Sequence, residues 1–252
     1  MVLYSLAFVG GFDLAAEWMG WQNMFHCEWN EFGQKVLKHY WPDAISYGDI
    51  TKTDFTLWRG KIDILTGGFP CQPYSMAGKR KGKEDERHLW PEMLRAIREI
   101  QPSWIVGENV PGIINWSGGL VFHEVQTNME AQGYEIFPII LPAISVNADH
   151  KRERCFFIAY SNGRRLQKSN SEFRQINGVF KKTPIKFTGT TSAQWDKGKR
   201  SSGMLCRSNG VSKELDGITF SKWRAESIKA YGNAIVPQVA FQIFKAIEQY
   251  HA

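Results

Sequence analysis

The chain has 252 residues, of which 43% are hydrophobic, and a formal net charge of +6. This composition is that of an ordinary globular protein with one sizeable domain and a small addition. No apolar run approaches the roughly 18 residues of a membrane span, and the start MVLYSLAFVGGF lacks the features of a signal peptide, so a cytoplasmic protein is expected. The four cysteines are scattered and form no CxxC pair, which indicates neither a metal site nor a disulfide framework.

Apolar runs alternate with helical patterns along the chain, in the manner of an α/β protein. Strands are predicted over residues 2–9, 24–28, 61–66, 103–108, 134–141 and 155–160. Helices are predicted over residues 13–20, 31–41, 88–100 and 120–132, and a last helix over 234–250 is expected to pack beside the first strand. A doubly wound sheet binds its ligands outside the carboxyl ends of its strands. Residues that follow or end these strands are therefore candidates for a site.

One such residue, Cys71, stands between two prolines in the stretch GGFPCQPYS, residues 67–75. Proline fixes the backbone angle φ, so a Gly/Pro loop of this kind suits a side chain that must be held at a set aim. A buried structural cysteine is the common alternative, and this stretch alone leaves both open. An unassisted thiol has a pKa near 8.5, so a nucleophilic Cys71 needs a nearby cation or a helix N-terminus.

The positive charge is concentrated in one segment. Between Ser161 and Lys213 there are twelve cations and two anions, a net charge of +10, which leaves −4 for the remainder. The segment is rich in small polar residues with interspersed aromatics, and it shows no helical period. These features suit a loop-rich insert that binds a polyanion, because phosphates are contacted by cations and base edges by short polar side chains. A solvated, partly disordered linker is the alternative.

Three stretches, GGFPCQPYS, GENVPG and HKRERCFFIA, are together very similar to the motifs of the DNA cytosine-5 methyltransferase family. Further stretches resemble its remaining motifs in the family's order, and the resemblance covers nearly the whole chain: GGFDLAAEWMGW, CEW at 27–29, GDI at 48–50, DERHLW at 85–90 and YGNAIVPQVA at 231–240. The resemblance implies the Rossmann-like sheet of an S-adenosylmethionine-dependent methyltransferase, built from residues 1–160 and 225–252. It also implies a small, loop-rich, basic target-recognition region at 161–224.

The same resemblance implies the reaction and the residues that perform it. The family transfers a methyl group to carbon 5 of cytosine in a specific sequence of double-stranded DNA, after the base has swung out of the duplex. Cys71 would add to carbon 6 and raise the electron density at carbon 5. Glu108 would donate a proton toward ring N3 if burial raises its pKa. Arg154 would hold the base oxygen O2, while Arg152 would support the loop or a phosphate.

For the cofactor, S-adenosylmethionine, the resemblance assigns a stacking position to Phe12, the ribose hydroxyls to Glu28, the adenine face to Trp29 and the adenine amine to Asp49. Four further residues are expected to line the same crevice, with the last in a Gly-Asn turn: Gly10, Pro70, Leu89 and Asn233. Each assignment has a structural alternative. Phe12 and Trp29 are equally consistent with core aromatics, Glu108 with a turn cap or ion pair, the arginine pair with surface ion pairs, and GNA with an ordinary helix start.

The chain departs from the family pattern at two positions. Before the Gly-Gly pair, either Phe8 stands where a glycine is usual or one residue is deleted, and His150 stands where a glutamine is usual before the arginines. Phe8 keeps open a catalytically impaired DNA-binding relative, and a transfer-RNA cytosine-5 methyltransferase on the same scaffold is a further alternative. Short methylases of this type resemble phage enzymes or partners of a restriction enzyme. A monomer without an obligatory protein partner is expected.

Overall fold

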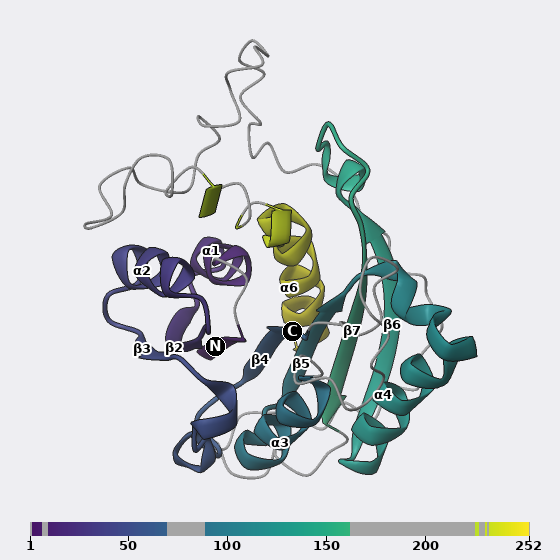
Figure 1. The fold of residues 1–252 in the computed structure, drawn as a ribbon, viewed down its shortest axis with the longest axis horizontal. Coiled ribbons are helices and arrows are strands. Elements are labelled where there is room, and N and C mark those ends of the chain that lie inside the picture. The colour runs from purple at the N-terminus through teal and green to yellow at the C-terminus, as the bar shows by residue number, and fades with distance from the viewer. Residues whose placement is uncertain are drawn as a thin grey trace.

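The computed structural model describes residues 2–6, 10–69, 89–161, 225–226, 230 and 232–251. Within these ranges, seven strands form one sheet with helices on both faces (Figure 1). The strands are β1 (Val2–Leu6), β2 (Gln22–Cys27), β3 (Ile45–Tyr47), β4 (Ile64–Gly68), β5 (Trp104–Asn109), β6 (Tyr134–Pro142) and β7 (Glu153–Ser161). The α-helices that lie within these ranges are α1 (Gly11–Trp18), α2 (Glu31–Tyr40), α3 (Trp90–Ile100), α4 (Leu120–Ala131) and α6 (Pro237–His251).

The strand order is β3-β2-β1-β4-β5-β7-β6, and the first five strands along the chain pair in parallel. β7 runs antiparallel between β5 and β6. The predicted α/β fold is thus confirmed, while the reversed strand β7 was not foreseen. β6 lies at the edge of the sheet, which explains how it accommodates Pro138, because an edge strand has one side without ladder hydrogen bonds.

Successive residues of the central strands supply two separate hydrophobic cores. Ile64 and Phe156 face one core, which is completed by α1 and α6. Their neighbours Leu65 and Phe157 face the other core, which is completed by α3 and α4. This alternation follows from the twofold side-chain period of a strand. Because both faces are covered, the ligand sites of the sheet are confined to its strand ends.

Capping side chains, prolines and residues with positive φ set the ends of the helices. The side chain of Asn30 accepts a hydrogen bond from the Gly33 amide at 3.0 Å and so caps α2. Pro91 occupies the first turn of α3, where its missing N–H group costs nothing. α3 ends at Ile100, because the next residue, Gln101, has a φ of 52° and is followed by Pro102. None of the helices in the described ranges is long and apolar enough to cross a bilayer.

The predicted elements are confirmed with shifted ends. β4 begins at Ile64, three residues later than predicted, because the Lys61 amide donates to the Trp58 carbonyl in a turn, 3.0 Å away. The strand β3 was missed, since its three residues are too short to show alternation. α6 begins at Pro237 and packs against α1 and the core residues of β4 and β5, while contacts with the side chains of β1 lie outside what the structure describes.

Candidate active site

The predicted site residues that the structure describes gather at one edge of the sheet. Glu28 follows β2, Asp49 follows β3, and Glu108 is the last residue but one of β5. Because β1 to β5 are parallel, these strand ends share an edge. β7 runs the other way and begins at the same edge, which brings Arg154 opposite the end of β5.

The central contact of this edge joins Glu108 and Arg154. The Glu108 side chain is buried, with 6% of the residue exposed, and its Oε1 lies 2.8 Å from Nε of Arg154. Burial raises the pKa of Glu108 to about 7, whereas the charges of Arg154 and Arg152 act in the opposite direction. Burial has the larger effect, so Glu108 takes up and releases a proton close to neutral pH. The structure thus shows the ion pair that was the structural alternative for Glu108, together with the raised pKa that its acid role requires.

Arg152 binds the backbone at the start of the C-terminal motif, residues 231–240. Its Nη2 donates hydrogen bonds to the carbonyl oxygens of Gly232, at 2.9 Å, and Ala234, at 2.5 Å. Arg152 also has a φ of 34°, a left-handed conformation that is uncommon for a residue with a side chain. These hydrogen bonds hold the backbone of residues 232–234, while the expected support of the loop or a phosphate stays a prediction.

Asn109 is a site residue to which the sequence assigned no role. It is buried, and its Nδ2 donates a hydrogen bond of 2.9 Å to the carbonyl oxygen of Phe69, at the end of β4. Its Oδ1 accepts from the Val110 amide at 2.8 Å. Phe69 is followed directly by Pro70 and Cys71, which lie outside the described residues. The signal in the sequence was an amide residue ending an otherwise apolar strand, beside the expected catalytic glutamate.

The carboxyl group of Glu28 is largely buried and has capacity to accept further hydrogen bonds. Burial raises its pKa to about 7, although its Oε1 accepts from the Asn30 amide at 2.7 Å. No cation in the described ranges forms an ion pair with it. A Cβ atom on Gly33 would lie 2.8 Å from Cγ of Glu28, so only glycine there leaves room for this side chain. A pair of neutral hydroxyl groups, such as a ribose offers, fits these requirements.

The two aromatic candidates have opposite environments. Trp29 is 74% exposed, directly beside Glu28, so the core alternative is wrong for Trp29, and its ring is free to stack on a planar ligand. Phe12 is 1% exposed and packs against Phe244 of α6, with ring centroids 6.1 Å apart. The ring thus packs in the core under α6, and the expected stacking of Phe12 on the cofactor stays a prediction.

Asp49 is an ionised acceptor at the end of β3. Its Oδ1 accepts from the amide and the hydroxyl of Thr51, at 3.0 and 2.7 Å, and its Oδ2 lies 3.4 Å from Nζ of Lys52. The Thr51 hydroxyl makes the largest contribution to a lowered pKa of Asp49. Leu89 is half-buried immediately before α3. Both positions are compatible with the expected crevice.

Gly10 and Gly11 allow α1 to begin in a crowded place. Gly10 has a φ of 75°, and a Cβ atom there would lie 2.5 Å from Cζ3 of Trp41. A Cβ atom on Gly11 would lie 2.6 Å from the carbonyl oxygen of Ile235. The glycine pair therefore lets the start of α1 approach the backbone that precedes α6. Phe8, two residues before Gly10, lies outside the described ranges.

The C-terminal motif differs in conformation from the expected turn. Gly232 and Asn233 have helical backbone, and the Ala234 amide donates to the Ala230 carbonyl at 2.8 Å. The Gly-Asn turn is thus corrected to the last turn of a helical segment. Asn233 is exposed, on the segment that Arg152 holds at the edge of the sheet.

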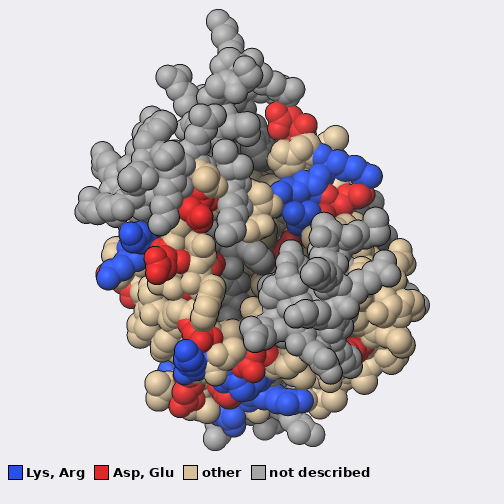
Figure 2. Space-filling view, viewed as in Figure 1, with Lys and Arg blue, Asp and Glu red and all other residues tan. Residues whose placement is uncertain are grey.

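The face drawn in Figure 2 carries cationic and acidic side chains side by side over its described part. The cations between Ser161 and Lys213 lie outside the described residues, as does the expected target-recognition region at 161–224 apart from Ser161, the last residue of β7.

A seven-stranded α/β sheet with a reversed strand, a carboxylate after β2 and an arginine-paired glutamate near the end of β5 are together typical of the methyltransferase class of nucleotide-cofactor folds. Residues 5–216 match the profile of the C-5 cytosine-specific DNA methylases. The chain belongs to this family, which confirms the resemblance of its motifs.

Individual relatives agree with the family match. The chain is 37% identical over 164 residues to the Type II methyltransferase M.Eco47II of Escherichia coli, covering 64% of this chain and 39% of that protein. It is 32% identical over 164 residues to the Type II methyltransferase M.HhaI of Haemophilus parahaemolyticus, covering 63% of this chain and 48% of that protein. The chain thus spans less than half the length of these curated relatives.

Solved structures show the same fold. One neighbour, described as a DNA modification methyltransferase encoded within an E. coli prophage, has a TM-score of 0.54 and 25% identity, over 64% of this chain and 46% of the other. The Dnmt2 methyltransferase of S. pombe has a TM-score of 0.54 over 86% of this chain and 58% of the other. At 16% identity, this second similarity concerns the fold alone.

Proposed function

We propose that the chain transfers a methyl group from S-adenosylmethionine to carbon 5 of cytosine in a specific double-stranded DNA sequence. The observation that carries this proposal is the buried Glu108, paired with Arg154 at 2.8 Å and able to hold a proton near neutral pH. Carbon 5 of cytosine is a poor nucleophile, so the reaction needs a covalent nucleophile at carbon 6 and an acid at ring N3. Glu108 supplies the acid.

The remaining catalytic roles follow the family motifs. Cys71 comes two residues after Phe69, whose carbonyl is fixed by Asn109, and we assign it the attack on carbon 6. Arg154 would hold the base oxygen O2 while orienting Glu108 through their ion pair. Arg152 would maintain this geometry through its bonds to the backbone of residues 232 and 234.

The cofactor-binding residues offer the complementary chemistry. When bound, S-adenosylmethionine supplies an electrophilic methyl group. Glu28 would accept from the ribose hydroxyls, Trp29 would cover the adenine face, and Asp49 would accept from the adenine amine. Gly10, Pro70, Leu89 and Asn233 would complete the crevice.

The proposal extends to organisation and setting. Residues 161–224 would form the target-recognition region, because they carry the excess of cations that phosphate contacts require. The chain would act as a cytoplasmic monomer without an obligatory protein partner. Similarity to Type II methyltransferases and to a prophage protein supports a role in marking DNA, as a phage enzyme or beside a restriction enzyme.

The test is bisulfite sequencing of an unmethylated plasmid after incubation with the purified protein and S-adenosylmethionine. We expect methylated cytosines in one short sequence context, and none with the matched variant Cys71→Ser. Modification by Cys71→Ser at the wild-type rate would overturn the nucleophile assignment. If the plasmid stays unmodified and transfer RNA is methylated, the substrate is RNA. Binding to DNA without binding to S-adenosylmethionine would identify a catalytically impaired relative.

A further inference from the structure

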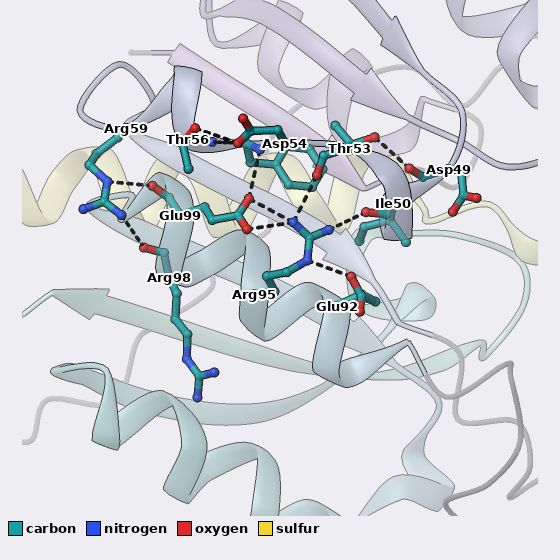
Figure 3. A network of polar contacts seen from close by, with 11 residues as sticks. Asp49, Ile50, Thr53, Asp54, Thr56, Arg59, Glu92, Arg95, Arg98 and Glu99 are labelled. Carbon is teal, nitrogen blue, oxygen red and sulfur yellow. Dashed lines mark hydrogen bonds and ion pairs between the residues drawn. The ribbon is translucent and has the colours of Figure 1, made fainter.

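Arg95 of α3 connects two parts of the chain that are far apart in sequence (Figure 3). Its guanidinium donates hydrogen bonds to the backbone carbonyl oxygens of Ile50, at 2.5 Å from Nη2, and Thr53, at 3.0 Å from Nη1. These two carbonyls stand at either end of the turn that Asp49 caps by accepting from the Thr51 amide. Arg95 therefore holds both ends of the turn that carries Asp49.

The guanidinium is itself fixed by several partners. Its Nε donates to Oε2 of Glu92 at 2.8 Å, and its Nη1 donates to Oε1 of Glu99 at 2.8 Å. Its carbon lies 5.6 Å from the ring centroid of Phe55, over the ring. Oε2 of Glu99 also accepts from the Phe55 amide at 2.9 Å, which anchors the next stretch of the same segment to α3.

This set of contacts differs from an ordinary surface ion pair. A pair of exposed charges contributes little to stability, and the Arg95 side chain is 30% exposed. The specific feature is the planar fork, which reaches two backbone carbonyls and two carboxylates at once. Lysine retains the charge but has only three donors on one atom, so it cannot satisfy all four acceptors. The geometry demands arginine for reasons of shape as well as charge.

We infer that Arg95 is a positioning residue for cofactor binding, which holds the Asp49 turn where the adenine end of the cofactor binds. The inference rests on the proposed function, because it takes Asp49 as the adenine contact. Arg95 acts through the backbone of residues 50–53 and does not itself touch the cofactor. Its loss therefore affects binding of the cofactor and leaves the chemical step unchanged.

The test compares Arg95→Met and Arg95→Lys with Arg98→Met, a control on the same helix whose exposed side chain points away from the network in Figure 3. For Arg95→Met we expect KM for S-adenosylmethionine to rise about tenfold, as for the loss of one good interaction, with kcat at saturation within about twofold. Arg95→Lys should raise KM by about threefold, and Arg98→Met should leave it unchanged.

A second readout needs no cofactor. In the cofactor-free protein, the Thr53 amide, which donates to the Ile50 carbonyl at 3.4 Å, should exchange its hydrogen faster in Arg95→Met than in Arg98→Met. Unchanged KM and unchanged exchange in both Arg95 variants would overturn the inference and leave the proposed function intact. If Arg95→Met fails to fold, the KM and the Thr53 amide exchange of Arg95→Lys decide whether the inference holds. A wild-type chain that binds no S-adenosylmethionine would overturn the proposed function, and this inference with it.

Discussion

The carboxyl group of Glu108 lies at the end of a buried strand and beside a guanidinium, and these two surroundings act on its pKa in opposite directions. Burial disfavours the charged form, while Arg154 favours it. Because burial has the larger effect, the raised pKa of about 7 leaves a substantial protonated fraction under the conditions where the reaction would run. An acid poised near the working pH is what proton donation to a ring nitrogen needs.

A pH profile tests this role. The protonated form of Glu108 prevails below its pKa of about 7, so the single-turnover rate of methyl transfer should decline as pH rises beyond that value. Glu108→Gln cannot give up a proton, so we expect its rate to be lower by about a hundredfold or more, with no decline around pH 7. Rates measured by incorporation of labelled methyl groups at saturating DNA and cofactor would supply both profiles.

The comparison of the two pH profiles tests whether the carboxyl group of Glu108 causes the decline in rate. A wild-type decline that persists unchanged in Glu108→Gln would assign the titration to another group. The stability of the folded protein should fall over the same pH range as the rate. The pKa of Glu108 is raised by folding, so ionisation of Glu108 reduces the free energy of unfolding as pH rises through about 7. Thermal denaturation at each pH therefore separates loss of folded protein from loss of the protonated acid.

At the scale of elements, the start of α2 determines the position of Glu28, the residue proposed to bind the ribose of the cofactor. The side chain of Glu28 lies against Gly33, where an added Cβ atom would stand 2.8 Å from its Cγ. A contact this short displaces the middle of the Glu28 side chain, since the helix backbone is held by the Asn30 cap. The glycine is thus needed for the position of a carboxylate, in a helix where glycine is otherwise unfavourable.

Gly33→Ala should consequently separate binding from stability. We expect KM for S-adenosylmethionine to rise by about tenfold, whereas the melting temperature should not fall, because alanine favours the helix by about 1 kcal/mol over glycine. Gly112→Ala is the matched control, since no heavy atom lies within 4 Å of the place its Cβ atom would take. Equal KM values in both variants would mean that the position of Glu28 does not limit cofactor binding.

The elements also show what the sequence can predict. Apolar runs located the strands that end at Glu28 and Glu108, while Asp49 was found only through the resemblance of GDI to a family motif, because β3 was missed. The sequence could not distinguish Phe12, which is buried, from Trp29, which is exposed, because the burial of Phe12 depends on a helix more than 220 residues later in the chain. The same reason applies to Asn109 and Arg95, whose partners lie 40 to 45 residues away.

At the scale of the whole molecule, charge is divided between two parts of the sequence. Residues 161–213 carry a net charge of +10, and the remainder carries −4. The described part of the face in Figure 2 correspondingly mixes both signs. DNA releases bound counterions when cations contact its phosphates, so affinity falls with salt in proportion to the number of such contacts. In this proposal, the salt dependence of DNA binding therefore arises in the segment 161–213.

Removing two cations from that segment should reduce the salt dependence by a known amount. For Lys181→Gln/Lys182→Gln, the slope of log K against log salt should become shallower by up to roughly two, since each phosphate contact contributes about 0.9 on duplex DNA. The control Lys38→Gln/Lys61→Gln makes the same change of charge on exposed residues of the remainder and should keep the wild-type slope. Both proteins should retain wild-type affinity for S-adenosylmethionine. If both double variants keep the wild-type slope, Lys181 and Lys182 contact no phosphates. A shallower slope only in the control would place the DNA on the sheet domain.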